Sequence, residues 1–184
     1  MIRTIALLLL SVLLALPQPS AALDLQGLYE QALTASRRGD FAEALPLWDQ
    51  VLQQSPDDAA ALSNRGNVRL ALGDPDGAIA DQSRSIHLAP EESDPHLNRG
   101  TAEEALQDWS AAAEDYLWIL EREPADASAL YNLANVRGSE GKWPEARELY
   151  GQASLARSRR TPLAGAPREQ WQRGGLLRRI FASQ

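Results

Sequence analysis

Hydrophobic, small and turn-forming residues recur along the chain with a period of about 34 residues. Four columns of the repeat are Pro56, Pro90 and Pro124; Ala44, Ala78, Ala112 and Ala146; Gly39, Gly73, Gln107 and Gly141; and Asp40, Asp74, Asp108 and Lys142. Between these columns the apolar residues follow helical spacing, as Leu62, Gly66 and Leu70 do. The pattern predicts two helices in every unit, and helices this short bury their apolar faces only when successive pairs stack.

Each column has a physical role in such a helix pair. Glycine adopts the left-handed backbone at the end of the first helix, and the aspartate after it caps the second. Alanine lets two helices approach closely, and proline ends the second helix. We therefore expect an all-α chain with complete repeats at residues 25–58, 59–92 and 93–126. A fourth repeat, 127–158, is predicted to be incomplete, because Ser154 and Ser158 replace the expected leucine or isoleucine and the expected proline.

This arrangement resembles the tetratricopeptide repeat family. Its units combine a small residue in the first helix, a Gly-Asp turn with an aromatic residue, alanine in the second helix and proline at the end. The resemblance covers residues 25–157. It implies a right-handed α-solenoid of stacked antiparallel helix pairs, with the first helices lining the concave face.

The resemblance also identifies the residues that face inward. Those that we select as a groove for a partner are Tyr29, Asn64, Asn67, Asn98, Thr101, Tyr131, Asn132 and Asn135. Asn64, Asn98 and Asn132 recur at one position, and an amide both donates and accepts hydrogen bonds. The resemblance therefore implies a ladder of amides that holds the backbone of an extended peptide. The alternative is that these amides bond neighbouring helices and only maintain the shape of the repeat.

The inward columns contain neither Lys nor Arg. The members of the family that clamp the C-terminal carboxylate of chaperones use these cations in the same columns. A carboxylate ligand would instead meet Glu30, Asp94 and Glu104. Docking to cytosolic chaperones is therefore not the function that the residues favour.

The first 22 residues have the order of a secretory signal peptide. Arg3 precedes an apolar run from Ile5 to Leu16, and small residues end at Ala22. The run of about twelve residues is too short to span a bilayer as a helix. We expect export to a periplasm or a thylakoid lumen, which also fits the resemblance of the repeats to exported proteins of photosynthetic bacteria and chloroplast lumens. The alternative is an uncleaved segment that anchors the protein in a membrane.

Residues 159–184 differ from the rest of the chain. Seven Arg and one Glu lie within residues 157–184, whereas the whole chain has a net charge of −7. Prolines and a Gly-Gly pair interrupt this segment, so we expect a loosely ordered basic tail. A frameshift would explain why the composition of the tail differs from that of the repeats. The other interpretations are a cap over the last repeat and an amphipathic segment that docks on an anionic membrane surface.

Composition limits the remaining chemistry. The hydrophobic share of 44% suits a folded domain, and the negative charge argues against a protein that binds nucleic acid with its whole surface. The absence of Cys excludes disulfides, a thiolate zinc site and a cysteine nucleophile. We interpret His87 and His96 as exposed residues of a link between repeats, and the pairs Glu103–Glu104 and Glu114–Asp115 as solvated.

The sequence thus contains no candidate catalytic residue, metal site or cofactor site. It predicts a non-catalytic scaffold or assembly factor that acts outside the cytoplasm. The protein would be a monomer, with a protein or extended peptide as its partner. The alternative function is association with a membrane surface through the basic tail.

Overall fold

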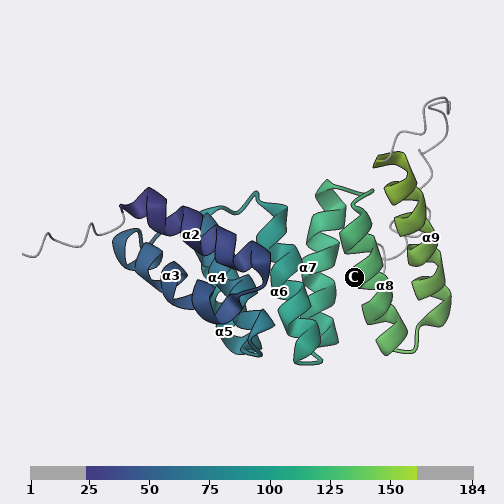
Figure 1. Ribbon diagram of the computed structural model, residues 1–184. Helices are drawn as coiled ribbons and strands as arrows, with labels where there is room; N and C mark the ends of the chain where they lie inside the picture. The colour runs from purple at the N-terminus through teal and green to yellow at the C-terminus, as the bar shows by residue number, and fades with distance from the viewer. Residues whose placement is uncertain (1–23, 161–184) are drawn as a thin grey trace, which may run out of the picture.

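A computed structural model describes residues 24–160. This part of the chain forms eight α-helices and no strand: α2 (Leu25–Arg38), α3 (Phe41–Gln54), α4 (Ala59–Ala71), α5 (Pro75–Leu88), α6 (Ser93–Ala105), α7 (Trp109–Arg122), α8 (Ala127–Ser139) and α9 (Trp143–Arg160). They form four antiparallel pairs that stack from α2 at one end to α9 at the other (Figure 1). The predicted fold class, a right-handed α-solenoid, is confirmed.

The predicted signal peptide, residues 1–22, lies outside the described residues. So does the predicted tail, apart from its first two residues. These two residues belong to α9, which is 18 residues long and ends at Arg160. The fourth helix pair therefore has a long second helix, which buries Ala146, Leu149, Ala153 and Ala156.

The turn within each pair has the left-handed backbone that the glycine column predicts. The φ angles are 80° at Gly39, 84° at Gly73 and 77° at Gly141. Gln107 occupies the same column and has a φ of 61°, the only positive φ of a residue other than glycine in residues 24–160. The geometry of the turn is therefore kept in the third repeat without glycine, at the cost of local backbone strain.

Small residues in the first helices make room for large ones in the second helices. A Cβ atom added to Gly100 would lie 2.7 Å from Cε1 of Tyr116, and one added to Gly66 would lie 2.8 Å from Nε2 of Gln82. Tyr116 and Gln82 occupy the same position of successive repeats, and both are fully buried. Close packing of α4 on α5 and of α6 on α7 therefore depends on the missing side chain.

The interior consists of two apolar clusters with a polar layer between them. One cluster joins the first repeat to α4, and the other extends from α7 to α9. Between them, α5 buries Asp81, Gln82 and Ser85. Arg65 on α4 pairs with Asp81, and Arg99 on α6 pairs with Asp115 on α7. At the same two positions of the fourth repeat stand two residues of the apolar cluster, Leu133 and Leu149.

The glycine of α6 gives a direct test of this packing. We expect Gly100→Ala to destabilise the protein by about 1–3 kcal/mol, because the new Cβ overlaps the buried Tyr116 ring. Urea denaturation of the variant and of the natural chain measures this difference.

The matched control is Gly151→Ala in α9, where an added Cβ meets nothing within 4 Å. This change should be neutral or stabilise by up to about 1 kcal/mol, because alanine is the better helix former. Equal midpoints for Gly100→Ala and the natural chain would show that the glycine is not needed for the contact.

Candidate functional site

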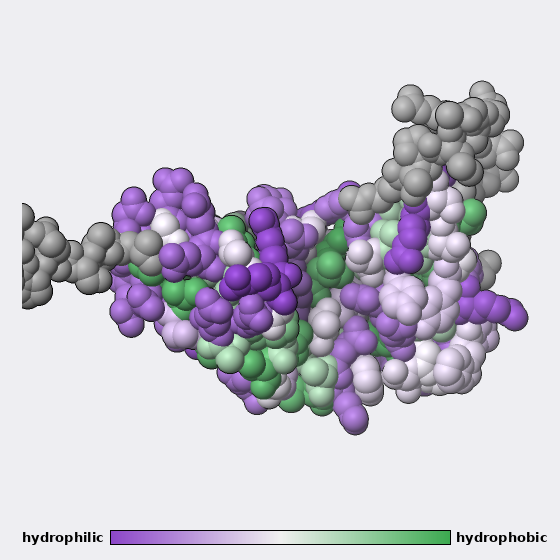
Figure 2. Space-filling model, viewed as in Figure 1, coloured by the Kyte–Doolittle hydropathy of each residue, from purple (hydrophilic) through white to green (hydrophobic). Residues whose placement is uncertain are grey.

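The first helices of the four repeats lie beside one another along the solenoid. α2 contacts α4, α4 contacts α6, and α6 contacts α8. This is the arrangement of a solenoid whose first helices line the concave face. In the view of Figure 2, hydrophilic residues dominate the α2 end, paler residues cover the α8–α9 end, and hydrophobic residues form only small areas.

Three of the predicted residues, Asn64, Asn67 and Asn98, line one pocket between α4 and α6. The pocket has a volume of about 460 Å³. The other lining residues are Ala59, Ala60, Ser63, Ser85, Ala89, Glu92, Asp94 and Pro95. They are small, hydroxyl-bearing or acidic, and none of the lining residues is Lys or Arg. The pocket therefore presents polar groups and negative charge to a ligand.

Each of these amides already makes a hydrogen bond within the protein. Asn64 Nδ2 donates to the carbonyl oxygen of Ala60 on its own helix at 2.9 Å. Asn98 Nδ2 donates to Ser63 Oγ at 3.3 Å and so joins α6 to α4. Asn67 Oδ1 accepts a hydrogen bond from Gln82 Nε2 at 3.0 Å. These bonds orient the amides, and they leave Asn98 Oδ1 and Asn67 Nδ2 without a partner among the described residues.

The two predicted tyrosines lie at opposite ends of the concave face. Tyr29 is half-buried and meets Trp48 edge-on, with ring centroids 4.9 Å apart. Burial raises the pKa of Tyr29, and an interaction with the Asn64 amide partly opposes the rise. Tyr131 is exposed and contacts Tyr150 at 5.4 Å, again edge-on. The Tyr150 hydroxyl donates to Asn135 Oδ1 at 2.6 Å.

Of the remaining predicted residues, Thr101 lies on α6 beyond the pocket and Asn132 lies on α8. The Thr101 hydroxyl donates to the carbonyl oxygen of Leu97 on its own helix at 2.9 Å. Asn132 is half-buried on α8. The eight predicted residues therefore form a central group around the pocket and two outer groups, and no single pocket contains them all.

Glu92 and Tyr150 belong to this face, although they are not among the positions predicted to face inward. One signal for Glu92 was present in the repeat. Its column otherwise holds aspartates, Asp24, Asp58 and Asp126, whose side chains accept a backbone N–H at the start of α2, α4 and α8. Glu92 makes no such bond at the start of α6. The replacement of the capping aspartate by Glu92 was therefore a signal in the sequence that this carboxylate does not cap its helix.

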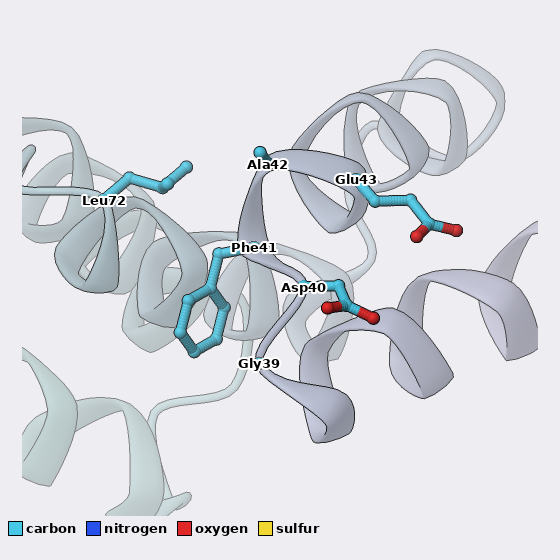
Figure 3. A pocket seen from close by; sticks show the side chains of 6 residues that line it. All are labelled: Gly39, Asp40, Phe41, Ala42, Glu43 and Leu72. Carbon is cyan, nitrogen blue, oxygen red and sulfur yellow. The ribbon is translucent and has the colours of Figure 1, made fainter.

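A second pocket, of about 570 Å³, lies where the turn of the first repeat meets the end of α4 (Figure 3). The carboxylates of Asp40 and Glu43 point away from Phe41 and Leu72. Arg38 pairs with both carboxylates, at 3.0 and 3.4 Å. Because Arg38 pairs with both acidic groups, this pocket lacks the unpaired carboxylates of the pocket between α4 and α6.

Three residues that were predicted to be exposed, His96, Asp115 and Glu103, are largely buried. His96 is 5% exposed, and its Nδ1 lies 2.7 Å from Oδ1 of the buried Asp115. The His96 ring stacks on Trp118, with centroids 3.8 Å apart. Arg99 donates to both oxygens of Asp115, at 2.7 and 2.8 Å. The prediction was wrong because His96 and Arg99 satisfy the Asp115 carboxylate inside the core.

The same cluster raises the pKa of a second carboxyl group. Glu103 is 12% exposed at its side chain, and its Oε2 is buried without a hydrogen-bond partner in residues 24–160. Burial, and then the nearby Asp115 charge, raise the pKa of Glu103 to about 7, although Arg99 acts in the opposite direction. Hydrogen bonds from Arg99 and His96 overcome the effect of burial on Asp115 and lower its pKa.

The described residues offer neither a metal site nor a membrane span. No group of three His, Cys, Asp or Glu side chains in residues 24–160 is placed to hold a metal ion. None of α2 to α9 is long and apolar enough to cross a membrane.

Comparison with known proteins identifies the repeat. The sequence model described as "Tetratricopeptide repeat" matches residues 29–93 and 97–164, which is more than two thirds of the chain. The tetratricopeptide repeat and J domain-containing co-chaperone DNJ1 of Fusarium oxysporum is 28% identical over 148 residues. The match covers 76% of this chain and 28% of the co-chaperone, so the chain spans less than a third of that relative.

Two solved structures share the fold at low sequence identity. MamA 41-end from Desulfovibrio magneticus RS-1 has a TM-score of 0.70 and 17% identity, over 76% of this chain and 78% of that one. The first TPR of Spaghetti (RPAP3), bound to the HSP90 peptide SRMEEVD, has a TM-score of 0.61 and 23% identity. That match covers 64% of this chain and 93% of the RPAP3 chain.

The buried Glu103 makes stability depend on pH. Its pKa rises from 4.5 to about 7 on folding, so the folded state binds a proton more tightly than the unfolded state. The favourable contribution is complete below pH 4.5 and is lost as the pH rises to about 7. In the natural chain this loss of stability is of order 2 kcal/mol. We expect Glu103→Gln to remove it. The melting temperature should therefore fall less between pH 5 and pH 8 in the variant than in the natural chain.

The exposed Glu148 on α9 provides the control, because Glu148→Gln removes a surface carboxylate that does not contribute to the raised pKa of Glu103. This variant should follow the pH dependence of the natural chain. If Glu103→Gln does so too, the carboxylate of Glu103 is ionised in the fold without penalty.

Proposed function

Because this chain belongs to the tetratricopeptide repeat family, we propose that it is a monomeric, non-catalytic scaffold whose concave face holds an extended segment of a partner protein. The observation that carries this proposal is the pocket between α4 and α6, where three asparagines from two consecutive repeats converge. An amide that is already oriented loses little conformational entropy when it bonds a peptide backbone. The groove is thus suited to main-chain recognition.

Proteins of this repeat family act as protein-binding scaffolds. The RPAP3 domain that shares this fold is solved with a peptide of HSP90. Its peptide, SRMEEVD, is acidic towards its C-terminus. The pocket of this chain instead contains Glu92 and Asp94 and no cation, so the same fold here favours a segment without a terminal acidic cluster.

The groove is tested by replacing its repeated asparagines. Peptides selected by phage display on the immobilised full chain provide the probes, and their affinity is measured by fluorescence anisotropy. We expect Asn64→Ala, Asn98→Ala and Asn132→Ala together to weaken these peptides by about tenfold or more, because each lost amide removes hydrogen bonds to the ligand. Helicity and melting should change little.

A structural role for the column predicts the opposite result. A single replacement would then lower stability by more than about 2 kcal/mol, and peptide affinity would follow the fraction of folded protein. Gln152→Ala on α9, a second helix, is the control for amide loss away from the first helices. It should leave affinity and melting unchanged.

We also propose that the protein acts outside the cytoplasm, in a periplasm or a thylakoid lumen. The support is the sequence of the first 22 residues, with one cation, a short apolar run and small residues before Leu23. Cell fractionation with N-terminal sequencing should find a soluble extracytoplasmic form that begins at Leu23. A full-length form that stays with membranes after a high-salt wash would contradict cleavage and favour an anchor.

A further inference from the structure

We infer that the pocket between α4 and α6 binds a lysine or arginine side chain of the segment held in the groove. This inference rests on the proposed function, because it names the side chain that the groove selects. The occupant is a peptide with a basic residue. Three features of the pocket indicate a basic side chain. Within residues 24–160, they are the amide groups that have no partner, the two carboxylates that form no ion pair, and the buried Gln82 oxygen that accepts no hydrogen bond.

The first feature is the direction of the hydrogen bonds. Gln82 Nε2 lies 2.9 Å from the backbone carbonyl oxygen of Ser63, which fixes this atom as the donor nitrogen. The same nitrogen is 3.0 Å from Asn67, so the Asn67 atom there is the oxygen and the spare atom is Nδ2. Asn98 donates through Nδ2 to Ser63 Oγ and keeps its oxygen. Among the described residues, the pocket therefore retains unpaired N–H groups on its three amides, and it offers Asn98 Oδ1 and two carboxylates as acceptors.

The second feature is the state of those carboxylates. Two other acids near the links between repeats have partners: Asp57 pairs with Arg84 at 2.7 Å, and Glu123 accepts a hydrogen bond from Ser93 at 2.7 Å. Within residues 24–160, Glu92 and Asp94 have no such partner, and both are exposed. Glu92 does not cap α6 although it stands in the capping column. Both negative charges are therefore available to a ligand.

The third feature is the group directly behind the pocket. Gln82 is 1% exposed and hydrogen-bonds two lining residues, Ser63 and Asn67. Its Oε1 is buried without a hydrogen-bond partner among the described residues. Gln82 therefore leaves one unpaired acceptor next to the residues that line the pocket. Two negative charges without a cation in the lining call for a positively charged ligand that donates hydrogen bonds, and among side chains these are the ammonium of Lys and the guanidinium of Arg.

The inference is tested with small probes that carry one side chain each. The isotope-labelled full chain is titrated with the N-acetyl, N-methylamide derivatives of Lys, Arg, Gln and Glu, and binding is followed by NMR at the backbone amides of Asn64, Asp94 and Asn98. The Lys and Arg derivatives should shift these signals to saturation. The Gln and Glu derivatives should shift them at least about fivefold more weakly, because they lack the positive charge.

The double variant Glu92→Gln, Asp94→Asn should weaken the Lys and Arg probes by about fivefold or more. The double variant Asp76→Asn, Glu114→Gln loses two exposed negative charges on the second helices α5 and α7, and it should bind as the natural chain does. Equal binding of the charged and neutral probes, or an equal loss in both double variants, would overturn the inference.

The two proposals fail in distinguishable ways. One outcome is that the asparagine replacements weaken the phage-selected peptides while the double variant Glu92→Gln, Asp94→Asn does not. That result would support the groove as the peptide site and contradict the binding of a basic side chain in the pocket. If the asparagine replacements leave those peptides unaffected, the groove itself is wrong.

Discussion

One arginine in each middle repeat fixes how successive helix pairs sit on one another. Arg65 on α4 donates to Asp81 on α5 at 2.6 and 2.8 Å and to Asp49 on α3 at 2.8 Å. Arg99 repeats this bridge at the same position of the next repeat, to Asp115 on α7 and to Ser83 on α5. Since a guanidinium donates in a fixed planar fork, each arginine holds two second helices at set positions around one first helix. Because desolvation cancels much of the attraction in a buried ion pair, its main consequence here is geometric: it sets the spacing of the first helices that form the groove.

Much of the fold could be predicted from the sequence because its main constraint is local. A helix end that needs a left-handed residue selects glycine, and that selection is visible at Gly39, Gly73 and Gly141 without any tertiary information. The buried charges could not be predicted in the same way. Asp115 and His96 look like surface residues when each is considered alone, and only their mutual contact makes them acceptable in the core. The signal that was available is a pair of columns, with Arg on the first helix and Asp on the second, which occurs in two successive repeats.

The groove was less accessible to sequence reasoning than the fold. The family pattern selects the inward positions, but it does not fix the rotamers of the amides there. Asn67 is oriented by Gln82, a residue of the second helix that the inward columns do not include. Glu92 and Asp94 are free because no cation among the described residues lies near them in the fold, and a single column of the repeat does not show which residues lie near each other in space. The chemical character of the pocket therefore follows from contacts between columns.

The third repeat departs from the others at three positions, which lie together in and next to α6. His96 stands where α2, α4 and α8 have Leu28, Leu62 and Leu130, and Glu103 stands where α4 and α8 have Arg69 and Arg137. Glu92 replaces the capping aspartate. Two of these changes lie on the side of α6 that packs against α7 and place titratable groups in the core, whereas the third lines the pocket. α6 thus carries a buried carboxyl group with a raised pKa, and the free charges of the pocket lie at its start. This helix therefore links titratable groups of the core to the pocket.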